Sequence, residues 1–491
     1  MKFKASIYAS LIFTGVSTGL FAADVWRAPT EDAPDGDWSD GATWVGGNVP
    51  TSSDTAKIDK LDSNTYSNSD VSVGRLDLFT GNVVVSGGTF STSISMVRAG
   101  TLTIGGTANF QTSSAFNSGD GQSDHQYMHE TQAIINVCDD AKLTDSNWGV
   151  LIGEEANQID VTANFYGNSV ITTGNSNGVK IGNSRDWAES AAAKSTLNVF
   201  ENSTVNASTL YFYKNATLNV YGNANFNIGG KAFIGDSKTN STANMNLGGK
   251  SATALKNYSF IFNGANITMS DEATLTIGNN LYVGTKDNND ASSTTSGHLI
   301  LKDNSKLIQS GHSLIMYGDD STIELHGSNI TVADGQSYMT KCLGSTSQAD
   351  AIGTGGKIKF VADKNGISTL VAGYIEYNDS SAQTGYALEI DFTNFAPTDG
   401  EGTYTFNVIS STNNWNGREA GIIQNYFNEA EIGNEDLVKI IKANDDDTYS
   451  FFTADGGKTF GITYNYVPEP STCAAIFGAI AIAFAAYRRR K

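Results

Sequence analysis

No proline interrupts the chain between Pro50 and Pro397. Proline cannot donate a backbone hydrogen bond to a neighbouring strand, so its absence over this length suits a body made of continuous β-sheet. Gly, Asn, Ser and Thr dominate the same stretch, with short alternations of Val, Leu, Ile and Phe between them. A polar composition of this kind also suggests intrinsic disorder, but the apolar alternation is too regular for a disordered chain. The sequence therefore predicts an all-β body.

A short phrase recurs along this body: Leu-x-Val, then a turn, then a further apolar residue. Its clearest copies are centred on Asn198 and Asn219. Further copies are centred on Thr103, Asn136, Asn164, Asn246, Thr276, Ile300 and Glu324, and consecutive centres lie 21 to 34 residues apart. A period of this size with variable spacing is typical of a solenoid, whose coils share strands while their loops differ in length.

The clearest copy also predicts which side chains face inward. In Leu197-Asn198-Val199, Leu and Val share one face of a strand and Asn takes the other. Stacked coils would align Leu and Val into an internal core, and would align the turn residues Asn168, Asn202 and Asn223 into a ladder of side-chain amides. We therefore expect a right-handed parallel β-helix. A β-sandwich array is the alternative, although strict hairpin signals are sparse.

The first 23 residues have the order of a secretory signal peptide. Lys2 and Lys4 precede an apolar run from Ala5 to Phe21, and the small residues Ala22 and Ala23 follow it. Several Ser and Thr residues interrupt the run, which is also short for a membrane anchor. We expect export by the Sec translocon and cleavage after Ala22 or Ala23.

The last 25 residues contain three elements in strict order. Val467, Pro468, Glu469 and Pro470 come first, an apolar stretch from Cys473 to Tyr487 follows, and the chain closes with the basic cluster Arg488, Arg489, Arg490 and Lys491. A basic cluster at this position favours a C-terminus on the cytoplasmic side of a membrane. A plain tail anchor is the alternative, with the Pro-Glu-Pro as a coincidence.

This order resembles the PEP-CTERM sorting signal of Gram-negative bacteria that produce exopolysaccharide. The resemblance is confined to residues 467–491. It implies an exosortase-type membrane protease as a partner, which would cut near Pro468-Glu469-Pro470 and release the body. It also implies an intermediate in the inner membrane and a final location at the cell surface or outside the cell.

Five segments follow from these features. We expect a signal peptide at 1–23, an N-terminal cap segment at 24–60, parallel β-helix repeats at 61–354, a β-rich cap region at 355–466 and a sorting signal with a transmembrane helix at 467–491. The N-terminal segment resembles the one that precedes exported β-helices such as autotransporter passenger domains, and Trp38 and Trp44 are expected to cover the open end of the solenoid. Helical spacing in the C-terminal cap predicts a short amphipathic helix made by Ile422, Ile423, Tyr426, Phe427 and Ala430.

Charge excludes nucleic acid as a partner. The chain has 51 acidic and 31 basic residues, a net charge of −20. Removing residues 1–23 and 467–491 takes away six basic residues and one acidic residue, which leaves 50 acidic and 25 basic residues, or −25. Such a surface repels phosphate backbones, because non-specific affinity for nucleic acid comes from basic groups that displace counterions.

Few residues of the sequence suggest a catalytic or metal-binding site. His125 and His129 lie four apart but lack the glutamate of a zinc metalloprotease motif, and His298, His312 and His326 complete the histidines. The acidic runs could act as catalytic carboxylates or calcium ligands, but Asp139-Asp140 falls at the same repeat offset as Glu201-Asn202, which indicates a turn. The other runs are Asp319-Asp320 and Asp445-Asp446-Asp447.

No cofactor is expected from these residues. Calcium held generally by so acidic an exported chain remains open, although Asp35–Gly41 departs from the calcium-loop pattern at Asp40 and Gly46. Whether Cys138 and Cys342 pair also remains open.

Three functions remain after this search. The first is a non-enzymatic surface, matrix or adhesin-like protein associated with extracellular polysaccharide. The second is a secreted polysaccharide lyase or glycosidase on the same scaffold. The third, carbohydrate binding alone, depends on whether Trp148, Trp187 and Trp415 lie exposed and coplanar.

Overall fold

The architecture was determined from a computed structural model. It describes residues 23–28, 35–119, 132–153, 159–174, 177–182, 193–235, 243–262, 264–286, 294–310, 313–316, 320–333, 338–341, 356–372, 374–377, 388–411, 438–456, 458–468 and 470–489.

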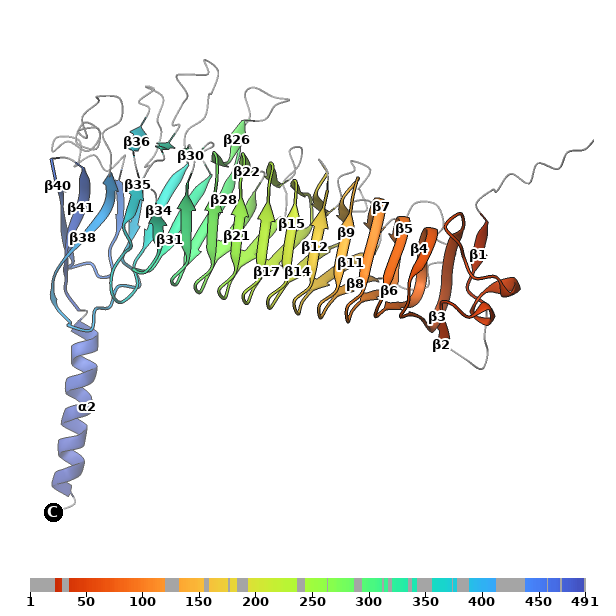
Figure 1. Ribbon diagram of the computed structural model, residues 1–491. Coiled ribbons are helices and arrows are strands. Elements are labelled where there is room, and N and C mark those ends of the chain that lie inside the picture. Colours follow the sequence, from red (N-terminus) through yellow and green to blue (C-terminus); the bar gives the residue numbers. More distant parts are fainter. Residues whose placement is uncertain are drawn as a thin grey trace, which may run out of the picture.

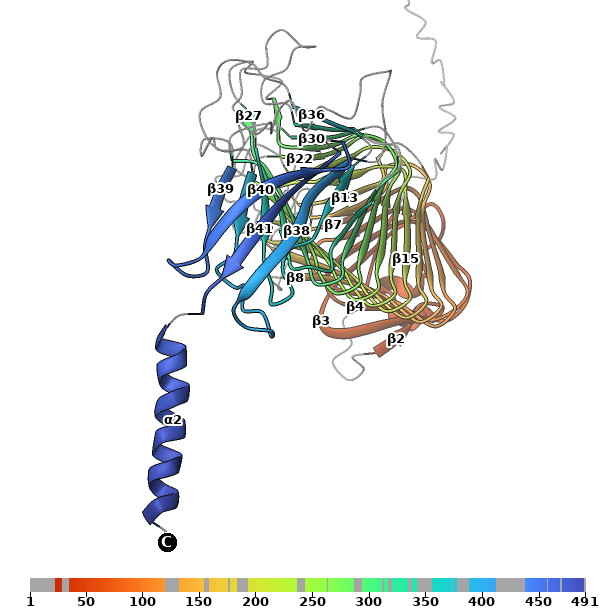
Figure 2. The ribbon, with the colours of Figure 1, turned by 90° about the vertical axis from the view of Figure 1, so that its left-hand side faces the viewer.

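The protein is an elongated, all-β stack of parallel strands (Figure 1). Three consecutive strands make one coil, as in β14 (Ser195–Val199), β15 (Thr204–Ala207) and β16 (Leu210–Phe212). Each strand pairs in parallel with the corresponding strand of the next coil: β17 (Ala216–Val220), β18 (Asn225–Ile228) and β19 (Ala232–Ile234). Repetition of this pairing gives three ladders, and the end-on view shows the coils lying one behind another (Figure 2). The expected all-β, parallel repeat architecture is confirmed at this level.

The first ladder contains β6 (Gly100–Ile104), β8 (Gln132–Val137), β11 (Asp160–Phe165), β14, β17, β20 (Asn244–Leu247), β23 (Ala265–Met269), β28 (Gly297–Lys302), β31 (Thr322–His326), β34 (Lys357–Val361), β37 (Leu388–Asp391) and β39 (Val438–Ile441). The second contains β9 (Lys142–Asp145), β12 (Val170–Thr173), β15, β18, β21 (Ala252–Leu255), β24 (Thr274–Ile277), β29 (Lys306–Gln309), β32 (Thr331–Ala333) and β35 (Leu370–Ala372). The third contains β10 (Val150–Ile152), β13 (Val179–Ile181), β16, β19, β22 (Ser259–Ile261), β25 (Leu281–Val283), β30 (Ser313–Met316), β33 (Tyr338–Lys341) and β36 (Tyr374–Tyr377).

Longer strands precede these coils. They are β3 (Thr55–Ser67), β4 (Val71–Val85), β5 (Thr89–Val97) and β7 (Asn109–Ser118), and the short strands β1 (Asp24–Trp26) and β2 (Asp35–Asp37) pair with β3. A two-stranded antiparallel pair, β26 (Thr285–Lys286) and β27 (Thr294–Thr295), lies outside the main sheet. Strand β3 spans residues 60 and 61, and the first ladder continues in parallel from β31 through β34 and β37 to β39.

Alternation decides which residues fill the interior. Leu197, Val199, Leu218 and Val220 are fully buried, whereas Asn198 between the first two faces outward. The predicted inward and outward faces are therefore confirmed. Burial of these side chains between the three ladders is the main stabilising contribution that each coil receives, since a single coil has no interior of its own.

One copy of the repeat phrase was assigned to the wrong ladder. Thr276 lies in β24 of the second ladder, and Thr268 of β23 holds the first-ladder position between Asn246 and Ile300. The two strands read Leu-Thr-Ile and Ile-Thr-Met, and both bury alternate residues. Alternation alone therefore cannot tell one side of a coil from another.

Both ends of the stack are covered. At the N-terminal end, Trp38 and Trp44 are buried with their ring centroids 4.8 Å apart, and Trp38 also packs edge-on against Phe90. At the C-terminal end, β38 (Gly402–Ser411), β41 (Thr459–Tyr466) and β40 (Thr448–Ala454) pair antiparallel and end the parallel order. The amphipathic helix expected around Ile422–Ala430 lies outside the described residues.

Candidate functional site

The C-terminal processing motif lies at the junction between the cap and a single helix, α2 (Pro470–Arg489). Val467 and Pro468 connect β41 to this helix, and Pro470 is its first residue, where the missing N–H of proline costs no helical hydrogen bond. Arg488 and Arg489 occupy the last turn. Glu469, Arg490 and Lys491 lie outside the described residues, as does Ala22 at the other end of the chain.

Val467 is fixed to the body through both of its backbone polar groups. Its N–H donates to Oδ1 of Asp447 at 2.7 Å, and its carbonyl accepts from Nδ2 of Asn444 at 2.9 Å. Asn444 and Asp447 belong to the turn that leads into β40. We call Asn444, Asp447 and Tyr464 the Val467 anchor. The ordered body therefore continues to the residue immediately before Pro468.

Asp447 is the centre of this anchor. Its side chain is fully buried and also accepts hydrogen bonds from the Tyr464 hydroxyl and from the backbone N–H of Asn444. Burial raises the pKa of Tyr464, and the bond to Asp447 raises it further, so the phenol stays protonated and donates. A buried carboxylate is stable only when it is supplied with donors in this way.

Helix α2 leads away from the body in both views (Figures 1 and 2). Ile480, Ile482 and Tyr487 on it are exposed, with 71% of the Ile482 surface accessible. At 1.5 Å per residue, 20 residues extend roughly 30 Å. Within the part of the chain that the structure describes, no helix meets the combined length and hydropathy required to cross a membrane. The helix itself was expected, and its membrane-spanning character stays a prediction.

At the other predicted processing site, Ala23 is the first described residue. Its carbonyl accepts a hydrogen bond from the N–H of Thr55 at 2.8 Å, next to the pairing of β1 with β3.

The turn interpretation of Asp139-Asp140 is confirmed. Asp139 has a left-handed backbone conformation, with φ of 58°, and its Oδ2 accepts from the N–H of Gly106 in the preceding coil. Asp140 accepts from the Asn168 amide at 3.0 Å. The expected amide ladder is also present, because Asn202 donates to Asn168 at 3.3 Å and Asn223 donates to Asn202 at 3.2 Å.

A second amide ladder, which the sequence did not lead us to expect, follows the outer face of the first ladder. Asn164 donates to Asn136, Asn198 to Asn164, Asn219 to Asn198 and Asn246 to Asn219, all at 2.8–2.9 Å. These residues are the centres of the repeat phrase. The signal was therefore present, but only the turn asparagines were interpreted as a ladder.

Charged residues replace the amides at the same register further along. Glu324, Lys359, Glu389 and Lys439 occupy successive central positions of β31, β34, β37 and β39. Lys359 lies 3.3 Å from Glu389 and 3.6 Å from Asp391, and Lys439 lies 3.5 Å from Glu389. We call these residues, together with His326, the charged strip. The charged strip was not expected from the sequence, because no copy of the repeat phrase was identified beyond Glu324.

Electrostatics in the charged strip favour ion pairing. The hydrogen bond from His326 lowers the pKa of Glu324 despite burial. Burial lowers the pKa of Lys359, but its contacts with Glu389 and Asp391 outweigh this effect, and the net direction is upward. Burial raises the pKa of Asp391, yet its bonds with Thr393 hold that pKa below the usual value. A general acid needs a raised carboxyl pKa and a lysine base needs a lowered one, so these directions do not suit Glu324 or Asp391 as a general acid, or Lys359 as a general base.

The remaining candidate residues either form hydrogen bonds within the fold or lie outside the described residues. Asp35, Asp37 and Asp40 accept hydrogen bonds from Asn64, Ser39 and Ala42 respectively. His298 and His326 face outward on strands, and no group of three or more His, Cys, Asp or Glu side chains among the described residues could hold a metal ion. Trp148 is exposed and Cys138 is a buried free thiol whose pKa burial raises. Seven further candidates lie outside the described residues: His125, His129, His312, Asp319, Cys342, Trp187 and Trp415.

Comparison of the chain with protein-family models, with curated proteins and with solved structures found no match. The function must therefore be argued from the chain itself.

Proposed function

We propose that this protein is an exported, non-enzymatic surface or matrix component whose body is a right-handed parallel β-helix released from a PEP-CTERM-type tail. One observation carries the proposal: the hydrogen-bonded body ends at Val467, and the Pro-Glu-Pro motif begins at the next residue. A protease that cuts at the motif would separate α2 from the body without breaking any β-sheet pairing. An exosortase-type protease and the Sec translocon are the partners that this scheme requires.

The outer surface supports a structural role. The amide ladders join asparagine side chains of the strands and turns through hydrogen bonds between coils, so they stabilise the stack. A net charge near −25 in the mature segment favours solubility outside the cell and opposes binding to nucleic acid. Association with extracellular polysaccharide follows from the tail resemblance and from the polar, hydroxyl- and amide-rich surface.

A secreted polysaccharide lyase or glycosidase is the second candidate. The charged strip favours it, because two carboxylates, Glu389 and Asp391, flank Lys359 on an outward face. The pKa directions do not suit Asp391 as a general acid or Lys359 as a general base, and we therefore place this candidate second. Reducing-end release from bacterial exopolysaccharides tests it: activity in the wild type that disappears in Lys359→Met would favour the enzyme.

Fractionation tests the leading proposal. The protein and a Pro468→Ala/Pro470→Ala variant are expressed in an exopolysaccharide-producing Gram-negative host that carries an exosortase. We expect the wild type outside the cell and the variant in the inner membrane. Pro397→Ala, a proline in a turn of the C-terminal cap, is the matched control and should be released as the wild type is. Equal release of wild type and double variant would overturn the sorting role.

A further inference from the structure

Turns that follow the first ladder form a regular stack along most of the body. In successive coils one residue of this turn has a positive φ, and these residues are Gly106, Asp139, Gly167, Glu201, Gly222, Gly249, Asp271 and Asp303. Acidic members accept a hydrogen bond from the preceding coil: the N–H of Gly167 donates to Glu201 at 2.8 Å, and that of Asp271 donates to Asp303 at 3.2 Å. Polar groups of the turn stack therefore form hydrogen bonds between successive coils.

The regular hydrogen bonding of the turn stack changes after Asp303. In the next coil Gly327 follows β31 and keeps a positive φ of 102°, but its N–H donates to the carbonyl of Val361 in the following coil at 2.8 Å. In the coil after that, Asp363 and Gly366 close a tight turn through two backbone hydrogen bonds of 2.9 and 3.1 Å. The Asp363 carboxylate accepts from the N–H and the hydroxyl of Ser328, both at 3.2 Å. Among the described residues no hydrogen bond joins Gly327 or Ser328 to Asp303 or Asn304, so the bonding of the turn stack is interrupted between these two coils.

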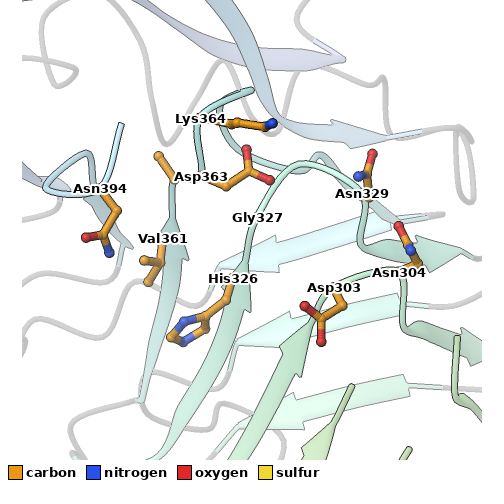
Figure 3. A pocket seen from close by; sticks show the side chains of 10 residues that line it. Asp303, Asn304, His326, Gly327, Asn329, Val361, Asp363, Lys364 and Asn394 are labelled. Atoms are coloured by element: carbon orange, nitrogen blue, oxygen red, sulfur yellow. The ribbon is translucent and has the colours of Figure 1, made fainter. Parts of the chain in front are cut away.

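A cavity of about 520 Å³ occupies this break (Figure 3). Its lining residues come from three coils and from the segment after β37: Asp303, Asn304, His326, Gly327, Asn329, Val361, Ala362, Asp363, Lys364 and Asn394. Figure 3 shows Val361 and Asn394 on one side of His326, and Asp303 and Asn304 on the other. This volume lies within the range of about 300–1,000 Å³ that small-molecule sites occupy.

Amide groups in the cavity differ from those of the turn stack. The side chains of Asn168, Asn202 and Asn223 are hydrogen-bonded to one another, as described above. Those of Asn304, Asn329 and Asn394 form no hydrogen bond with any described residue, and all three are exposed. The cavity therefore presents three unpaired amides, each able to donate and to accept, beside the Asp303 carboxylate and the Lys364 ammonium.

We propose that this cavity binds a neutral oligosaccharide, and this inference rests on the proposed association with extracellular polysaccharide. Sugar hydroxyls need donors and acceptors in close alternation, which the three amides provide. Uronic acids are disfavoured because Asp303 and Asp363 line the same space and the whole body is acidic. The break in the turn stack is thus the binding site.

Binding is measured on the purified body by titration calorimetry and ligand-observed NMR. The probes are cellohexaose, laminarihexaose and maltohexaose as neutral chains, and hexagalacturonate as the acidic chain. At least one neutral hexasaccharide should bind the wild type, and each of Asn304→Ala and Asn329→Ala should weaken it about five-fold through loss of amide hydrogen bonds. Asn202→Ala, an asparagine at the same turn position within the regular stack, is the matched control and should leave affinity unchanged.

Three results would overturn the inference. They are no binding of any neutral hexasaccharide, tighter binding of hexagalacturonate than of the neutral chains, and equal affinity in the wild type and both cavity variants. Circular dichroism of each variant establishes that it is folded. Release from the host is followed in parallel, because normal release without binding defeats only this inference, whereas retention in the membrane defeats the proposed function.

Discussion

The carboxylate of Asp447 accepts a hydrogen bond of 2.7 Å from the backbone N–H of Val467, 20 residues further along the chain. This contact joins the turn before β40 to the segment after β41. It ties the last residue of the body to a fully buried side chain. The boundary between a stable body and a removable tail therefore has a specific structural basis in this protein.

Asp447→Asn should weaken this boundary. The amide keeps the shape of the carboxylate but loses its charge-assisted bonds to Val467, Asn444 and Tyr464, at a cost of about 2 kcal/mol. Backbone amides of β41 and Val467 should then exchange hydrogen roughly 30-fold faster, as measured by mass spectrometry. Asp446→Asn, the exposed neighbour, is the control and should not change exchange. Unchanged exchange in Asp447→Asn would show that the anchor is dispensable.

Asn198→Ala should destabilise the stack. It removes two bonds of 2.8 Å, one to Asn164 and one from Asn219, at about 1–2 kcal/mol in total. Urea unfolding followed by circular dichroism measures the change. The control is Thr217→Ala, a partly buried residue of the first ladder in the next coil, which should cost less. Equal effects would mean that the amide ladder adds nothing beyond the strands.

Gly222→Ala should be more costly than alanine at another glycine with the same backbone conformation. Gly222 has φ of 71°, and a Cβ there would lie 2.9 Å from the backbone nitrogen of Glu201 in the preceding coil. Gly456 has φ of 68° with no atom within 4 Å of the added Cβ. We expect a loss of about 2–4 kcal/mol for Gly222→Ala and about 1–2 kcal/mol for Gly456→Ala in urea unfolding. Similar losses would contradict close stacking of the turns.

His298 should make stability depend on pH. Burial lowers its pKa below the ordinary value of 6.5, so the unfolded chain binds the proton first as pH falls. Stability from neutral His298 is present above pH 6.5 and is lost as pH falls below 6.5 towards the folded-state pKa. Thermal unfolding between about pH 5 and pH 7 should show a smaller loss of stability in His298→Gln than in the wild type.

Thr322→Val is the control for this pH effect. It removes the hydroxyl that contacts Nδ1 of His298 at 2.9 Å but leaves the ring that titrates. Its pH dependence should resemble that of the wild type. A His298→Gln profile parallel to the wild-type profile would assign the acid sensitivity to other groups.

Periodicity in the sequence predicted the outline of the fold because it depends only on neighbours in the chain. The alternation in Leu197-Asn198-Val199 placed two residues inside and one outside, and the recurrence of Asn at turns predicted the amide ladder. The same reasoning misplaced Thr276, since strands on two sides of a coil bury alternate residues equally.

Features that depend on long-range register could not be predicted in this way. Lys359 and Glu389 meet only because β34 and β37 pair in that register. Asp447 belongs to an acidic run that suggested only candidate carboxylates, and its burial accompanies the antiparallel pairing of β40 with β41. The cavity near Asp303 lies where the hydrogen bonding between successive turns changes, and no local sequence motif predicts that change.

Intact-mass analysis of the protein purified from its own host tests the central claim most directly, because it reports both ends of the chain at once. The account predicts a product outside the inner membrane that begins near Ala23 or Asp24 and ends near Pro468. A membrane-bound product that retains Arg488 to Lys491 would contradict release from a sorting tail and would make the protein a tail-anchored one.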